Sequence, residues 1–287
     1  MQEVLKTLEN LNTSNVIEIR HFLERAAWPG ADYSKFLANF PQAVVDSDNK
    51  ANLARKVAEL KSTWDAFEAE WNAAEKDPNK DKIYRGFTSF NVMGFSNMVK
   101  DINSKLKAHP ELKIIVQSRE KEILEIKKID TVVKGMESRA STPRLDTATK
   151  LHDTQVGIEG LIKEASLSGL YHLLTILQDK NQLKHLHAET KFFGQTTLRS
   201  LINQIQHKAH ELLDARIQDK SITEDDLRKG EAIAHTKVGV SFFKSKEETQ
   251  NAATHADNFS NLKTRYQSIV ENPSQKKSPE DILPPHP

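Results

Sequence analysis

Large apolar residues recur every three or four positions through an otherwise charged stretch in the first third of the chain. Steps of three and four residues return a side chain to nearly the same angle on an α-helix, so these residues form one apolar stripe. The pattern predicts a long amphipathic helix with Asp48 as its N-cap, which ends near Lys76, before the turn-forming segment 77–79. The stripe consists of Leu53, Val57, Leu60, Trp64, Phe67 and Trp71.

Related stripes predict further helices along the chain. Proline sets some of their ends: a short helix that starts near Tyr33 ends before Pro41, and another stops before Pro110. Thr223 and Asp226 have the spacing of a capping arrangement at a helix start. The other helices are expected over residues 2–12, from Ser14 to Pro29, and over 111–137, 146–166, 168–179, 183–218, 223–243 and 246–271.

These patterns predict an all-α fold, a bundle of long amphipathic helices arranged as one bundle or as two packed sub-bundles. Glycine and proline number only 10 each and 28% of the residues are charged, which suits long helices with one wet face and leaves few turns for a sheet. The polar, aperiodic segment 138–144 is the best linker candidate. The predicted division is an N-terminal helical bundle over 1–140, a C-terminal helical bundle over 141–272 and a disordered Pro-rich tail over 273–287.

The charge balance argues against nucleic acid as a main partner. Lys and Arg together number 41, Asp and Glu 40, and the net charge is +1, whereas nucleic-acid binders usually carry a basic excess or a basic stripe. The absence of cysteine excludes disulfides, thiol nucleophiles and thiolate metal sites. The N-terminus shows no cleavable signal peptide, and no apolar run approaches a membrane span of about 20 residues. The expected location is the cytoplasm, with signal-less secretion left open.

No motif of an enzyme active site stands out. The sequence has no phosphate-binding loop, dinucleotide-binding fingerprint, nucleophile elbow or zinc-protease motif, so no catalytic residue and no cofactor is predicted. The densest group of metal-ligand types is His207, His210, Glu211 and Asp214, which share one helix face and suit zinc, iron or manganese. About 100° of rotation per residue, however, places His207 and Asp214 nearly opposite the apolar stripe of their helix. A solvated polar face is therefore favoured over a metal site.

The segment over residues 84–98 is the strongest candidate for a binding surface. It is rich in aromatic residues and methionine, which are frequent at binding surfaces because they offer large and adaptable contact area. Gly86 and Gly94 allow a kinked backbone that a plain core helix would not need. Such clusters are more often core, so a plug at one end of the bundle is the competing interpretation. The predicted partner-binding residues are Tyr84, Phe87, Phe90 and Phe95.

The function expected from these features is protein–protein interaction or regulation by a helical protein without enzymatic activity. In its cysteine-poor, Lys/Asn/Gln-rich composition and its polar C-terminal tail, the chain resembles translocated effectors of intracellular bacteria. That resemblance implies a host protein as partner, such as a small GTPase or a trafficking factor. The alternative is a metal-dependent helical-bundle enzyme in which His152 or Asp153 joins the polar face at 207–214. A membrane-surface binder ranks last, because acidic residues are mixed into every polar face.

Overall fold

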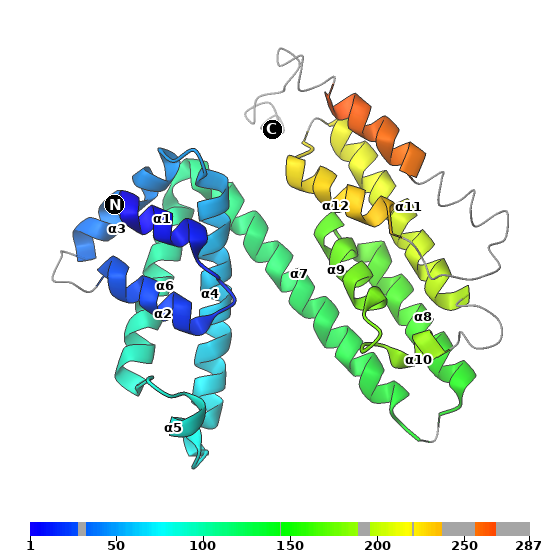
Figure 1. Ribbon diagram of the computed structural model, residues 1–287, viewed down its shortest axis with the longest axis horizontal. Coiled ribbons are helices and arrows are strands. Elements are labelled where there is room, and N and C mark those ends of the chain that lie inside the picture. Colours follow the sequence, from blue (N-terminus) through cyan, green and yellow to red (C-terminus); the bar gives the residue numbers. More distant parts are fainter. Residues whose placement is uncertain (28–32, 144, 189–195, 220, 237–255, 268–287) are drawn as a thin grey trace, which may run out of the picture. The chain divides into compact units, whose positions relative to one another are not determined.

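The computed structural model describes residues 1–27, 33–143, 145–188, 196–219, 221–236 and 256–267, so the predicted tail over 273–287 lies outside the described residues (Figure 1). Within these ranges the regular elements are helices and none is a strand, which confirms the predicted all-α class. No helix of the described ranges is long and apolar enough to cross a bilayer.

Internal contacts divide the chain into two units, Met1–Leu124 and Glu125–Pro287. The division falls inside the long helix α7 (Pro110–Ala140), so each unit owns one part of that helix. A division by contacts does not show which pieces fold independently. The sequence-based domain boundaries at residues 140 and 272 therefore stay predictions.

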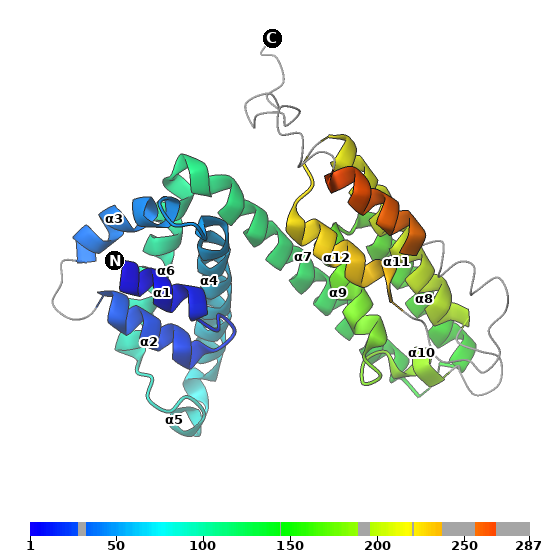
Figure 2. The same cartoon turned by 45° about the horizontal axis from the view of Figure 1, so that its top comes forward.

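The first unit is built around the helix that the apolar stripe predicts. α4 (Lys50–Ala73) continues into a 3-10 turn, η1 (Ala74–Lys76), and packs most extensively against α6 (Ser89–Ala108). All six stripe residues are buried, and Trp64 has no exposed surface. α1 (Gln2–Asn10), α2 (Val16–Ala27) and α3 (Tyr33–Val45) pack against α4, and α2 and α3 also contact α6. Figure 1 and Figure 2 both show α1 and α2 side by side, with the short α5 (Lys80–Ile83) near one end of α4.

Two helix boundaries in this unit differ from the prediction. Pro41 lies inside α3 instead of ending a helix before it. Proline removes one helical hydrogen bond, but Phe40 and Val44 are fully buried on either side of it, and this packing keeps the helix continuous. The N-cap of α4 is Asn49 and not Asp48. Asn49 makes no capping bond with its side chain, which instead donates to Glu9 Oε1 at 2.9 Å.

The second unit has a core of mainly Leu and Ile side chains. It is formed by α8 (Thr147–Glu164), α9 (Leu167–Gln178), α11 (Thr196–Gln218) and α12 (Glu224–Ala234), with the short α10 (Lys184–Ala188) against α8 and α11. A helical segment over 256–267 adds Phe259 and Leu262 to the same core. Thr223 and Asp226 form a capping box at the start of α12, as predicted.

Other boundaries in the second unit are corrected by the structure. The predicted linker over 138–144 is partly helical, because α7 continues to Ala140. The side chain of Glu137 in this last stretch accepts a hydrogen bond at 2.9 Å from the backbone N–H of Leu183, which holds the end of α7 against its own unit. The single helix predicted over 183–218 is described as α10 and α11, and residues 189–195 between them lie outside the described residues.

Candidate functional site

The aromatic segment over 84–98 divides at Thr88 into a part that packs in the core and a part that lines a pocket. Thr88 is the N-cap of α6: its hydroxyl accepts from the backbone N–H of Asn91, and the Asn91 side chain accepts from the N–H of Thr88 at 2.7 Å. This reciprocal capping fixes the residue at which the loop becomes a helix. From that point, helical rotation sends successive side chains to different faces of α6.

Before Thr88, Tyr84 and Phe87 pack against the apolar stripe of α4. The ring of Phe87 lies 4.7 Å from the ring of Phe67, and the ring of Tyr84 lies 5.4 Å from that of Trp71. Aromatic rings attract each other at such separations when they are tilted, and both side chains are half-buried. Their packing fits the plug interpretation, and a partner-binding role for them stays a prediction.

The loop before α6 is tied to α2 by one arginine. Arg20 donates a hydrogen bond to the carbonyl of Gly86, and its guanidinium lies 5.3 Å from the centre of the Phe87 ring. Gly86 has a φ of 86°, in the left-handed region that residues with a side chain rarely adopt. This backbone conformation lets the carbonyl meet Arg20, so it helps to place α2 beside the start of α6.

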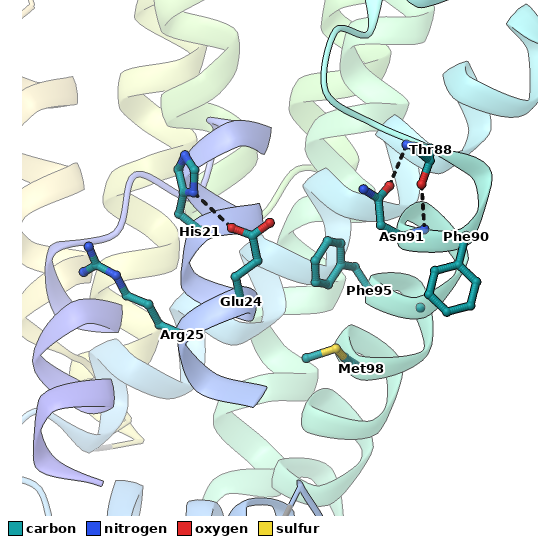
Figure 3. A pocket seen from close by; sticks show the side chains of 9 residues that line it. His21, Glu24, Arg25, Thr88, Phe90, Asn91, Phe95 and Met98 are labelled. Carbon is teal, nitrogen blue, oxygen red and sulfur yellow. Dashed lines mark hydrogen bonds and ion pairs between the residues drawn. The ribbon is translucent and has the colours of Figure 1, made fainter. Parts of the chain in front are cut away.

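After Thr88, α6 forms one wall of a pocket of about 710 Å³, and α2 forms the other (Figure 3). This volume is in the range of ligand-binding pockets, roughly 300–1,000 Å³. Phe95 and Met98 line it from α6, together with Phe90, whose ring is 75% exposed, whereas Phe95 is only 4% exposed. Gly94 also lines the pocket, and a Cβ atom added there would meet no other atom within 4 Å. The pocket is therefore open above Gly94.

The α2 wall carries charged groups that are paired to different extents. Glu24 accepts from Arg20 Nε at 2.7 Å and pairs with His21 Nδ1 at 3.2 Å. Burial raises the pKa of Glu24, but the hydrogen bonds from Arg20 and His21 lower it by more, so its pKa lies below the ordinary 4.5. Arg25, by contrast, makes no hydrogen bond or ion pair within the described part of the chain. In Figure 3 its guanidinium points away from Phe95, toward the opposite side of α2.

The four candidate metal ligands share one face of α11, and three of them are engaged in ion pairs. The His207 side chain is 74% exposed and pairs with Glu211 at 3.3 Å. Asp214 pairs with Arg265 of the 256–267 helix, and His210 is half-buried. No group of three or more His, Asp or Glu side chains within the described ranges is arranged to hold a metal ion. That this face carries no metal stays a prediction for the protein in solution.

Of the four predicted partner-binding residues, Phe90 and Phe95 line the pocket from α6, and no residue of the α2 wall was predicted. His21, Glu24 and Arg25 lie within two turns of one helix, which is the ordinary pattern of a solvated polar face. Nothing in their spacing distinguishes a pocket rim from such a face. The packing of α2 beside α6 is what makes these three side chains part of the site.

Comparison with known proteins assigns no function to the chain, so the assignment has to rest on the chemistry of the pocket. No protein-family model matches the chain, and no match was found among curated proteins or solved structures. An all-α fold by itself is compatible with many activities, so the function has to be inferred from the site.

Proposed function

We propose that the chain is a helical protein-binding module that takes an apolar side chain of a partner protein into the pocket between α2 and α6. The observation that carries this proposal is the pocket itself, with Phe90 on its lining and 75% exposed. Covering apolar surface that is otherwise exposed to water stabilises a complex by roughly 25 cal/mol per Å². Phe95 and Met98 supply the covered apolar lining that a buried side chain of the partner would contact.

The apolar surface extends beyond the pocket, which supports a protein partner over a small molecule. Met93 lies one turn after Phe90, on the same side of α6, and is 59% exposed. Aromatic residues and methionine are enriched in the centres of protein interfaces, and methionine adapts its shape to the partner. A small ligand enclosed in the pocket would leave Met93 in water, whereas a protein segment laid across the pocket would cover it.

The proposal is tested by capture of partners with Phe90→Ser and with a matched control. Ile114→Ser is the control, because Ile114 is 72% exposed on α7 of the same unit but does not line the pocket. The unchanged chain and Ile114→Ser should capture the same protein from a lysate, and Phe90→Ser should lose it while unfolding at the same temperature. Equal capture by Phe90→Ser would contradict the proposal.

A translocated effector that acts on a host small GTPase or trafficking factor is one specific form of this function. The support for this form is the resemblance of the chain to such effectors in its composition and its polar C-terminal tail. Identification of the captured protein by mass spectrometry decides whether the partner belongs to either class.

A further inference from the structure

The exposed face of α6 carries no charge over the first half of the helix. No residue over 86–99 is charged, although 28% of the chain is. An exposed helix face usually carries charged residues, and depletion of charge together with large apolar side chains is typical of the centre of a protein interface. The side chains that this part of α6 turns toward the solvent belong to Phe90, Met93, Gly94 and Asn97.

Phe90 and Gly94 form a projection and a hollow on this same face. Phe90 is 75% exposed. Gly94 follows one turn later on the same side of α6, and a Cβ atom there would meet no other atom within 4 Å. In Figure 3 the Phe90 ring points away from the Phe95 ring, so it borders the pocket without filling it. The chain thus presents an apolar side chain and an apolar hollow that it does not bring together by itself.

A two-fold axis between two copies of α6 would bring them together. If the two helices meet antiparallel with the axis at the level of residue 92, position 90 of each copy faces position 94 of the other, because both positions lie two residues from the axis. In such an isologous contact the same pair of residues meets twice. Identical groups also face each other near the axis, so a charged residue there would meet its own charge. The uncharged face over 86–99 avoids this repulsion.

We infer that the chain forms a symmetric dimer in which Phe90 of each copy occupies the α2–α6 pocket of the other copy. This inference rests on the proposed function and names the partner as a second copy of this chain. Each ring enters above Gly94 and contacts Phe95 and Met98, which line the pocket. Met93 lies one residue from the axis level, so the dimer covers this exposed side chain as well.

Sedimentation of the full chain over a range of concentrations measures the dimer, and two single substitutions locate it. Phe90→Ser removes the projection, and Gly94→Phe fills the hollow from an exposed position that has room for a Cβ atom. Each change occurs twice in a symmetric dimer. Each variant should therefore raise the dissociation constant by at least about a hundredfold, which is about tenfold for each of the two contacts. Ile114→Ser is the control, because Ile114 is exposed in the same unit but does not line the pocket.

A mixture of Phe90→Ser with Gly94→Phe tests the pairing of positions 90 and 94. In a mixed dimer the unchanged Phe90 of one copy faces the unchanged Gly94 of the other, and the introduced phenylalanine faces the introduced serine. A large side chain then meets a small one at both contacts. The mixed dimer should form with a dissociation constant within about tenfold of that of the unchanged chain, although neither variant dimerises well alone.

Cross-linking provides a second readout of the axis. The chain contains no cysteine, so a single introduced thiol can be linked only to the same thiol of another copy. Met93→Cys places the thiol one residue from the axis level, and a short bismaleimide should link it into a covalent dimer. Ile114→Cys, which is equally accessible on α7, should remain unlinked at the same protein concentration.

The outcomes separate this inference from the proposed function. A chain that stays monomeric up to about 500 μM would overturn the inference, while loss of a different captured protein in Phe90→Ser would still support the proposed function. A dimer that Phe90→Ser leaves intact, or that the mixture does not restore, would also overturn the inference. The proposed function fails as well if Phe90→Ser changes neither the dimer nor the capture of another protein.

Discussion

Phe87 and Phe90 lie three residues apart in one aromatic segment, but the structure uses them in opposite ways. Phe87 is half-buried against Phe67, with ring centres 4.7 Å apart, whereas Phe90 is 75% exposed. The difference arises at Thr88, where the loop that covers α4 ends and α6 begins. Residue type therefore shows that both side chains are large and apolar. Only the path of the backbone shows which of the two side chains the rest of the protein covers.

The largest loss of stability is expected at Trp64, against which Phe87 packs. Trp64 is fully buried, its indole N–H donates to Ser96 Oγ at 2.9 Å, and its ring lies 5.7 Å from that of Phe95. Trp64→Ala should lower the free energy of unfolding by about 3–5 kcal/mol, because it leaves a large cavity in the core and removes the hydrogen bond that Ser96 Oγ accepts there. Urea denaturation measures this loss, and an unchanged midpoint would show that the stripe is not core.

Single substitutions of Phe87 and Phe90 by serine test the comparison between these two residues directly. Phe87→Ser should lower the free energy of unfolding by about 1–3 kcal/mol, because it removes half-buried ring contacts with α4. Phe90→Ser should change it by no more than about 0.5 kcal/mol, because the ring is mostly in water. Denaturant melts of the two single variants give both numbers. The opposite order of stabilities would reverse the assignment of core and binding surface.

The two glycines of the segment should respond to alanine with opposite signs. Gly86→Ala should destabilise the protein by about 1 kcal/mol, because φ at Gly86 is 86° and the new Cβ would lie 3.0 Å from the guanidinium of Arg20. Gly94→Ala should stabilise it by about 0.5–1 kcal/mol, because Gly94 is inside α6 and its Cβ would meet no atom within 4 Å. Thermal melts of the pair provide the check, and a gain in stability for Gly86→Ala would argue against the turn before α6.

The smallest effect on stability is expected at Glu24, which lines the pocket between α2 and α6. The pKa of Glu24 is lower in the folded protein than its ordinary value of 4.5, so its pairing with Arg20 and His21 contributes stability above that value. This contribution is lost as the pH falls through the lowered pKa, and it should be below about 1 kcal/mol, because the side chain is 36% exposed. The difference in stability between the unchanged chain and Glu24→Gln should therefore be largest above pH 4.5 and shrink as the pH falls through the lowered pKa. A constant difference across this fall in pH would contradict the prediction.

Local geometry explains why several elements could be predicted without the fold. The capping box of Thr223 and Asp226 depends on contacts within one helical turn, and the rotation of a helix was enough to place His207 opposite the apolar stripe, where it is 74% exposed. Pro41 shows the limit of such rules. Its preference to end a helix is local, and the burial of Phe40 and Val44 outweighs it.

The sequence by itself determined the all-α class, the long helix α4 and the burial of Trp64, because helical periodicity and the removal of apolar surface from water act on each helix separately. Only the tertiary structure decided that Phe87 is half-buried against α4 while Phe90 is left exposed, and that His21 and Arg25 line the pocket beside α6. These features depend on which faces of α2, α4 and α6 meet. Many pairings of amphipathic faces bury similar apolar area, so the pattern of one helix cannot specify its neighbour.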